Sequence, residues 1–497
     1  MKLSINIKLL FVVHVVAGSE PGIRVRLTRN GLDYADHIGA ILLNSEIQRT
    51  QIPDLTVDLD GGPGTGQATA RNMRIVNFRQ LSYSYALHPP SALEWNTIGG
   101  SVTIAGDWIA WYKLLFTLWF KGGFTASVND IRLSATVSAI KDTDGKPAVK
   151  LLSCSSKIGS VSVQINGGFI QSIINLFRSD IAAAVKSALE TQVCKQASTV
   201  LVSILNQKLK SLPTKVSLGD NFMFDYSLHS SPTIGDDYTE GLINGSITWK
   251  DGSSAPIDCP PLPPVTGQLT RMVYIWGSDY VLNTFLQSAH IHNASRVDVD
   301  GQTFPDAAPY LRTTCPGQVC VGNISHYIQD HYPNKNTQVE LLTTSAPKAI
   351  INPQHARLSV TVRANLFVEP KASQNLLVVF DIVFAGDLTV KVANEIRTDA
   401  GPRLVGDLTI DEFTVQVNRS NVGYISPLEI DLVVTFARPF LQKLANSYLN
   451  AGVVVPTIPD VKLLNSQVSL LERAVQVDAD VMYKNYTSQR MRQYKFP

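Results

Sequence analysis

The stretch "APIDCPPLPPV", residues 255–265, contains five prolines in eleven residues and divides the chain into two halves. Proline fixes the backbone angle φ and lacks an N–H donor, so this stretch can form neither a helix nor a central strand. It favours an extended, semi-rigid connector. We therefore predict a linker over residues 246–270, an N-terminal domain over residues 19–245 and a C-terminal domain over residues 271–497.

The half before the linker begins and ends with a predicted helix. Residues 31–47 and 168–194 have apolar residues at helical spacing. Between them lie period-two strands such as "DIRLSATVSAI", residues 130–140. One face of this strand carries Ile131, Leu133, Ala135, Val137 and Ala139. This half is predicted to be helix, long antiparallel strands, helix.

The half after the linker repeats the order. Helices are predicted over residues 277–289 and 428–449, with strands such as "RLSVTVRANLF", residues 357–367, between them. Long twisted strands around amphipathic helices make an elongated α+β roll, and a sheet lined by Leu, Ile and Val can leave an apolar groove unfilled. Whether side chains fill that groove does not follow from the pattern.

The first twenty residues, "MKLSINIKLLFVVHVVAGSE", have the pattern of a signal peptide. Lys2 and Lys8 are followed by an apolar run over residues 9–16 and then by small residues. We predict that residues 1–18 are removed and that the protein is secreted and extracellular. No later stretch is long and apolar enough to span a bilayer.

The composition restricts the classes of partner. The chain has 43 basic and 41 acidic residues, a net charge of +2, with 44% hydrophobic residues. Such a balance gives no electrostatic reason to bind nucleic acid. The chain is long enough for two hydrophobic cores.

Five cysteines in a predicted secreted chain indicate disulfides. Cys154 ends a strand-like segment and Cys194 a helical one, so their bond would join helix to sheet. Cys315 and Cys320 flank a Pro-Gly turn and can close a small ring. Cys259 is then left over, although it can also pair with either of those two.

Five candidate N-glycosylation sites fit the same secreted compartment: Asn244, Asn293, Asn323, Asn418 and Asn485.

The segment "GDWIAWYKLLFTLWFKGG", residues 106–123, is too short to span a membrane, but as a strand it is apolar on both faces. A half-buried strand needs only one apolar face. The second face suits a hairpin tip in a membrane interface, where Trp and snorkelling Lys side chains are favoured. In the alternative, both faces are buried, either in the end of the N-terminal roll or in a dimer contact. The predicted membrane-tip residues are Trp108, Trp111, Lys113, Phe116, Trp119, Phe120 and Lys121.

The sequence contains no pattern typical of an enzyme. G-x-S-x-G and H-E-x-x-H are absent, and "GGPGTG", residues 61–66, lacks the Lys-Ser/Thr of a phosphate loop. We expect His290, His292, His326 and His331 to be solvated rather than to bind zinc. We therefore predict no catalytic residues, no metal and no cofactor.

Five stretches resemble the family of bactericidal/permeability-increasing protein and lipopolysaccharide-binding protein. They are residues 21–39 ("PGIRVRLTRNGLDYADHIG"), 151–167, 174–195, 272–289 ("MVYIWGSDYVLNTFLQSA") and 455–483. The resemblance implies a boomerang of two elongated lipid-binding barrels joined by a central sheet and the Pro-rich linker. It also implies the Cys154–Cys194 disulfide and an apolar pocket for phospholipid acyl chains in each barrel.

By position, this resemblance assigns the pocket linings to the helices of each half. The first pocket would be lined by Leu32, Ala35, Ile38, Ile174, Phe177, Ile181 and Val185. The second would be lined by Tyr280, Phe285, Leu432, Phe436 and Phe440.

The chain departs from the family at the far end of the first barrel. Lipopolysaccharide-binding members are rich in Lys and Arg there, whereas this chain has the aromatic segment 106–123. We predict a secreted protein that holds phospholipid as cargo, docks on membranes or lipid particles through its aromatic tip and carries or transfers lipid. The alternative is innate-immune recognition of bacterial lipopolysaccharide with antibacterial activity. The sequence does not decide the oligomeric state.

Overall fold

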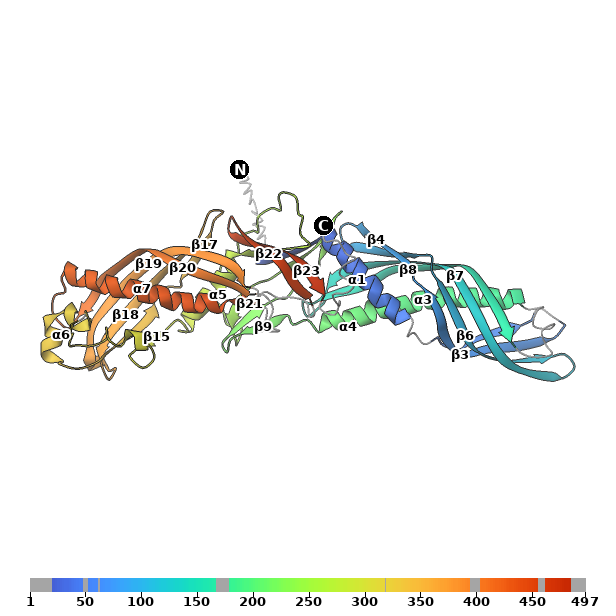
Figure 1. Ribbon diagram of the computed structural model, residues 1–497, viewed down its shortest axis with the longest axis horizontal. Coiled ribbons are helices and arrows are strands. Elements are labelled where there is room, and N and C mark those ends of the chain that lie inside the picture. The colour runs from blue at the N-terminus through green and yellow to red at the C-terminus, as the bar shows by residue number, and fades with distance from the viewer. Residues whose placement is uncertain are drawn as a thin grey trace, which may run out of the picture.

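The computed structural model describes residues 20–47, 52–60, 63–166, 178–317, 319–393, 403–454 and 461–483. The predicted signal peptide lies outside these residues. The molecule is elongated, with one sheet-and-helix half at each end and a further sheet between them (Figure 1). The predicted α+β class is confirmed.

The N-terminal half is built on a long antiparallel sheet whose described strands follow the order β2-β3-β6-β7-β5-β4, with β8 on the other side of β7. Its longest strand, β7, pairs with β8 from Gly123 to Lys141. The strands are β2 (Leu55–Leu59), β3 (Thr65–Arg79), β4 (Ser82–His88), β5 (Ala92–Ile98), β6 (Ser101–Lys113), β7 (Thr117–Lys141) and β8 (Pro147–Asn166).

The C-terminal half has a corresponding antiparallel sheet, in the described order β15-β16-β18-β19-β20-β21, with β17 paired to β18. The strands are β15 (Val297–Val299), β16 (Thr337–Thr343), β17 (Lys348–Ile351), β18 (Ala356–Val368), β19 (Leu376–Ala393), β20 (Arg403–Ser420) and β21 (Val453–Val454). The strand predicted over residues 357–367 lies within β18, where alternate residues face the core: Leu358, Val362 and Ala364 are buried and Val360 is half-buried.

A central sheet joins the halves, because it takes strands from both in the order β11-β12-β1-β14-β23-β22. A small sheet, β13-β10-β9, lies beside it. These strands are β1 (Ile23–Thr28), β9 (Lys215–Leu218), β10 (Phe222–Asp225), β11 (Thr233–Ile234), β12 (Tyr238–Ile243), β13 (Ile247–Trp249), β14 (Val273–Ser278), β22 (Val461–Leu471) and β23 (Ala474–Tyr483). The linker between β13 and β14 contains no helix or strand, and its Leu262 is buried against Tyr274 and Trp276.

The helices lie along the sheets (Figure 1). They are α1 (Arg29–Ile47), α3 (Arg178–Ser198), α4 (Leu205–Lys210), α5 (Asp279–Ile291), α6 (His326–His331) and α7 (Pro427–Ala451), and a π-helical segment, Thr199–Ile204, connects α3 to α4. The helices predicted over residues 31–47, 277–289 and 428–449 are confirmed to within two residues. α7 starts at a capping box, in which Ser426 and Glu429 bond each other's backbone N–H.

The open edges of β8 and β20 are covered by helix side chains that take the place of a neighbouring strand. The Val149 N–H donates to Asn206 Oδ1 at 2.7 Å, and Asn206 Nδ2 donates to the Val149 carbonyl at 2.8 Å. Asn446 makes the same pair of bonds with Leu408, at 2.6 and 3.1 Å. Both sheet edges are thereby closed against a helix, which satisfies backbone groups that an exposed edge would leave unpaired.

Two disulfides are present, Cys154–Cys194 and Cys315–Cys320, and Cys259 is free. The first joins β8 to α3, as the sequence predicts. However, Cys154 lies within β8 and Cys194 within α3 rather than at their ends.

The strand predicted over residues 130–140 lies within β7, and burial varies along it. Ile131, Leu133 and Ala135 are buried, but past a register shift between Thr136 and Val137 the buried residue is Ser138. Val137 and Ala139, on the same predicted face, are half-buried.

Candidate functional site

The β6–β7 turn lies at the outer end of the N-terminal half (Figure 1). It presents apolar side chains to solvent. Leu114, Leu115, Phe116 and Trp119 are 48%, 95%, 66% and 66% exposed. Lys113 and Lys121 are exposed beside them. These six residues are called the tip below. Monomeric soluble proteins rarely leave such a contiguous apolar group in water, so the tip has the features of a binding surface.

The tip rests on a rigid base. Trp111 pairs directly with Trp119 across the two strands, and Tyr112 pairs with Leu118. The Gly64 N–H donates to the Tyr112 hydroxyl at 2.9 Å, which fixes the start of β3 to this hairpin. Because the supporting residues are held by strand pairing, the tip keeps its shape without a partner.

Two of the predicted membrane-tip residues belong to the interior. Trp108 is 7% exposed, and its indole N–H donates to the Gly123 carbonyl at 3.2 Å. Gly122, opposite it in β7, leaves room for the ring, since a Cβ there would lie 2.9 Å from Trp108 Nε1. Phe120 is half-buried and packs against the same core. Both side chains lie on the inner face of the hairpin, so they support the tip instead of forming it.

The predicted pocket residues of α1 differ in their burial. Ala35 is exposed. Ile38 packs with Tyr34 and Met272 in a closed cluster beneath the central sheet, and Leu32 is also buried. The helical spacing identified the buried face correctly, but that face packs on the junction of the two halves.

The opposite side of α1 is held by polar contacts to aromatic residues of β4 and β5. The Trp95 indole N–H donates to Asp36 at 2.9 Å, and the Tyr85 hydroxyl donates to Asp33 at 2.5 Å. Tyr83 stacks on Trp95 with ring centroids 5.2 Å apart. Burial and the nearby Asp36 raise the pKa of Tyr83 to about 12, so its hydroxyl stays protonated and can donate.

Of the pocket residues predicted around α3, Ile174 and Phe177 lie outside the described residues, as does the side chain of Ile181. Val185 is half-buried. None of the described side chains of α3 is fully buried. The helix is nevertheless attached to β8, because the Ile158 N–H donates to Glu190 Oε1 at 2.8 Å.

In α5, the predicted pocket residues lie on the side that faces away from the core of the C-terminal half. Phe285 packs 4.7 Å from Phe222 of the small sheet, measured between ring centroids. Tyr280 lies next to Gly22 at the start of the helix. The residues of α5 that pack on the C-terminal core are Leu282 and Leu286. A helix between two apolar layers carries two apolar stripes, so periodicity alone cannot tell which one faces a given pocket.

Of the predicted residues in α7, Phe440 packs on the C-terminal core, whereas Leu432 and Phe436 do not belong to that cluster. Phe436 packs 5.1 Å from Tyr310 and Phe440 packs 5.5 Å from Phe304, as centroid distances. Leu432 is half-buried. The residues of α7 that pack on the core are Ile430, Val433, Val434, Phe440, Leu441, Leu444, Ala445 and Leu449. Their spacing of three and four residues is the signal that would have found this face.

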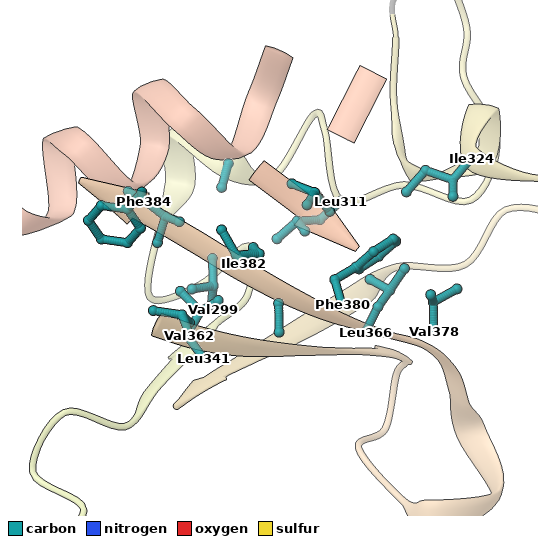
Figure 2. Packing of buried hydrophobic residues seen from close by; sticks show 14 of the residues in the cluster. Val299, Leu311, Ile324, Leu341, Val362, Leu366, Val378, Phe380, Ile382 and Phe384 are labelled. Atoms are coloured by element: carbon teal, nitrogen blue, oxygen red, sulfur yellow. The ribbon is translucent and has the colours of Figure 1, made fainter. Parts of the chain in front are cut away.

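The core-facing side of α7 is incompletely covered. Beneath it lies a dense cluster that includes Phe380, Ile382 and Phe384 of β19 (Figure 2). In α7 itself only Leu441 is fully buried among its 25 residues, all of which are described. Protein interiors are normally packed to crystal-like density. The accessible apolar surface left along α7 is therefore a surface that an acyl chain can cover.

Three of the five candidate glycosylation sites, Asn293, Asn323 and Asn418, are exposed. Asn244 is half-buried, and its Nδ2 donates to Ser227 Oγ at 2.8 Å. Asn485 lies outside the described residues. The Asn244 amide is thus already used by the fold.

The free Cys259 lies in the linker and is half-buried. Burial, with the negative charges of Glu20 and Asp279, raises the pKa of its thiol to about 12. A thiol with such a pKa is unreactive at neutral pH.

Among the described residues, no group of His, Cys, Asp and Glu is placed to hold a metal ion. No described helix has the length and hydropathy needed to cross a membrane.

An elongated pair of sheet-and-helix halves, with accessible apolar surface along a helix and an apolar tip, defines a lipid-binding class of protein. Comparison with known proteins agrees. Residues 31–207 match the N-terminal domain of the LBP / BPI / CETP family, and residues 217–483 match its C-terminal domain. The chain belongs to this family, whose members bind or transfer lipid and are not enzymes.

Several relatives match over nearly the whole chain. The bactericidal permeability-increasing protein of Sebastes schlegelii is 22% identical, covering 96% of this chain and 98% of that protein. The lipopolysaccharide-binding protein of Homo sapiens is 25% identical, covering 94% of each. The phospholipid transfer protein of Mus musculus is 22% identical, covering 93% of this chain and 90% of that protein. A crystal structure of lipopolysaccharide binding protein shares the fold, with a TM-score of 0.57 at 22% identity over 94% of this chain and 100% of that one.

Proposed function

We propose that this protein is a secreted lipid carrier. In this account it holds phospholipid acyl chains between its helices and sheets, and it docks on membranes or lipid particles through the tip. The observation that carries the proposal is the exposure of Leu115, Phe116 and Trp119 at the end of a rigid hairpin. Trp and snorkelling Lys side chains are favoured at a bilayer interface, and the tip offers both.

Docking by the tip is driven mainly by burial of apolar area. Each large side chain contributes on the order of 2 kcal/mol when it leaves water. The two flanking charges, Lys113 and Lys121, are exposed and therefore screened by salt. Binding of neutral vesicles through the tip should consequently change little between low and high salt.

The test replaces Leu115, Phe116 and Trp119 together by Ser and measures binding to phosphatidylcholine vesicles by flotation. The matched control replaces Val76, Ile98 and Val383, exposed apolar residues on the strands away from the tip. We expect the tip variant to lose most vesicle binding while its thermal unfolding is unchanged, and the control to bind as the parent does. Equal binding by the tip variant would contradict the docking role.

Recognition of bacterial lipopolysaccharide is the second candidate, favoured by relatives named for that ligand and for bactericidal activity. The tip itself offers only two cations, Lys113 and Lys121, to the phosphates of such a ligand. Vesicles of phosphatidylcholine with and without lipopolysaccharide distinguish the two candidates. A large preference for the lipopolysaccharide vesicles that depends on the tip would favour recognition over transport.

A further inference from the structure

A small cluster of polar and aromatic side chains connects the start of the linker to the helix that follows it. Trp249 ends β13, and residues 250–253 form the turn with which the linker between β13 and β14 begins. His292 caps the C-terminal end of α5. The Trp249 and His292 rings stack with their centroids 4.4 Å apart and their planes 1° from parallel. Trp249, Asp251, Ser253 and His292 are called the His292 cluster below.

The hydrogen bonds of the His292 cluster determine where its protons lie. His292 Nδ1 is 2.9 Å from the Ser288 carbonyl oxygen, which can only accept, so Nδ1 carries a proton. The Ser253 hydroxyl oxygen is 2.5 Å from Asp251 Oδ1 and 2.8 Å from His292 Nε2. A hydroxyl has a single proton and cannot donate to both. When Ser253 donates to Asp251, His292 Nε2 must therefore donate to Ser253.

Asp251 is the group that accepts the Ser253 proton. Hydrogen bonds from the Ser253 hydroxyl and the Ser253 N–H, together with the charge of His292, hold the pKa of the Asp251 carboxyl below its ordinary value. Asp251 is therefore ionised throughout the range in which histidine takes up its proton. The bonds to Ser288, Ser253 and Asp251 are all satisfied at once only when both nitrogens of His292 carry a proton and the ring is positive.

Two further features favour a positive ring at this place. His292 lies at the C-terminal end of a 13-residue helix, where carbonyl groups without a helical partner carry partial negative charge. Trp249 stacks on the ring, and a cation over the face of a tryptophan is attracted by the negative face of the indole. The helix and the tryptophan thus act in the same direction as the carboxylate of the turn.

The other charged and titratable groups of the turn, of the end of α5 and of the segment after it are bonded to other partners. Lys250 Nζ donates to Asn221 at 3.2 Å, His290 Nδ1 lies 2.7 Å from the Thr343 hydroxyl, and Arg296 forms an ion pair with a glutamate of β16. These groups are held outside the His292 cluster.

We propose that the His292 cluster is a pH-sensitive contact that fastens the start of the linker to α5 in acid and loosens as the pH rises. Below about pH 6.5 histidine becomes positive, and the ring can then donate from both nitrogens. Because the folded contact favours the proton-bound ring, the stability that it adds is present below about pH 6.5 and is lost above it.

The contact lies where the two halves of the molecule meet. Phe285 of α5 packs on Phe222 of the small sheet, and the Ile247 N–H of β13 donates to the Thr284 hydroxyl of α5 at 2.9 Å. The small sheet precedes the linker in the sequence, and α5 follows it. A tighter His292 cluster therefore stiffens this junction in acidic surroundings. This inference goes beyond the proposed lipid carriage, since it involves no lipid.

The experiment measures hydrogen–deuterium exchange of the full chain at about pH 5.5 and about pH 8, on either side of the histidine titration. Peptides that cover residues 249–254 report on the turn, in which the Gly252 N–H donates to the Trp249 carbonyl at 2.8 Å. Parent and variant are compared at the same pH, so the intrinsic pH dependence of exchange cancels. We expect Ser253→Ala and His292→Gln each to speed exchange roughly three- to tenfold at about pH 5.5 and far less at about pH 8.

Two variants serve as controls. Ser253→Thr keeps the hydroxyl and should behave as the parent at both pH values. His331→Gln is the matched control, because the His331 ring also stacks on an aromatic ring, that of Tyr327 at 3.8 Å, and lies 3.1 Å from the Tyr327 carbonyl oxygen. Among the described residues, however, it has no serine and carboxylate partner. This variant should leave exchange of residues 249–254 unchanged.

Two results would overturn the proposal. If Ser253→Ala speeds exchange equally at both pH values, the contact does not respond to protonation of the ring. If neither Ser253→Ala nor His292→Gln changes exchange at about pH 5.5, the contact does not hold the turn. Thermal unfolding checks that each variant is folded. No lipid is present in the measurement, so its outcome is independent of docking by the tip.

Discussion

Asn206 connects α4 to the edge of β8 with one side-chain amide, which both accepts from and donates to Val149. Replacing it by Ala leaves a backbone N–H and a carbonyl without partners. We expect Asn206→Ala to lower the free energy of unfolding by about 1–3 kcal/mol. Urea denaturation measures this. Asn450→Ala, which removes an exposed bond to Asp407, is the control and should cost far less.

Asn244 is the candidate glycosylation site that the fold disfavours. A glycan on Nδ2 would displace the hydrogen bond to Ser227 and disturb the contact of Asn244 with His229. We expect peptide mapping of the secreted protein to find Asn244 unmodified and Asn293 glycosylated. Full occupancy at Asn244 would show that this polar cluster is not formed when the chain is modified.

Glu340 links stability to pH. Burial raises the pKa of its carboxyl, but hydrogen bonds from Lys371 and Asn365 and the charges of Lys371 and Arg296 outweigh burial and hold the pKa below its ordinary 4.5. A lowered pKa contributes stability above the ordinary value, and this stability is lost as the pH falls below about 4.5. Unfolding free energies should therefore fall more steeply with acid in the parent than in Glu340→Gln. An equal fall of the unfolding free energy with pH in the parent and in Glu340→Gln would contradict this role.

At the scale of elements, the two disulfides should differ in their effect on stability. The Cys154–Cys194 bond closes a separation of 40 residues, and the Cys315–Cys320 bond one of 5. In the chain-entropy model these loops are worth about 4 and about 2 kcal/mol. The double replacement Cys154→Ser with Cys194→Ser should accordingly lower the melting temperature more than Cys315→Ser with Cys320→Ser. Calorimetry compares the two variants.

The limits of sequence-based prediction are clearest within single elements. The bounds of α1, α5 and α7 follow from local spacing, which is why they agree with the structure. The direction of each apolar face depends on what lies across from it. Phe285 faces the small sheet and Trp108 faces the inner side of its hairpin because of tertiary neighbours that periodicity does not contain. Ala35 is predicted as a pocket residue but is exposed, because its spacing in the helix does not show what lies across from it.

At the scale of the molecule, the repeat of helix, strands and helix around the Pro-rich linker was enough to predict two α+β halves. The central sheet and the lipid-binding barrels came from the family resemblance, because pairing between β1 and β14 leaves no local signal. The average charge was misleading. It concealed an excess of basic residues over residues 141–215, ten against four acidic ones, which a count along the sequence shows.

We propose that the two halves carry lipid. It is tested most directly by extracting the folded, secreted protein and quantifying bound lipid per chain by mass spectrometry. We expect phospholipid at about one molecule per half. A monodisperse, folded protein without bound phospholipid would contradict it, because the apolar surface along the helices would then need no acyl chain to cover it.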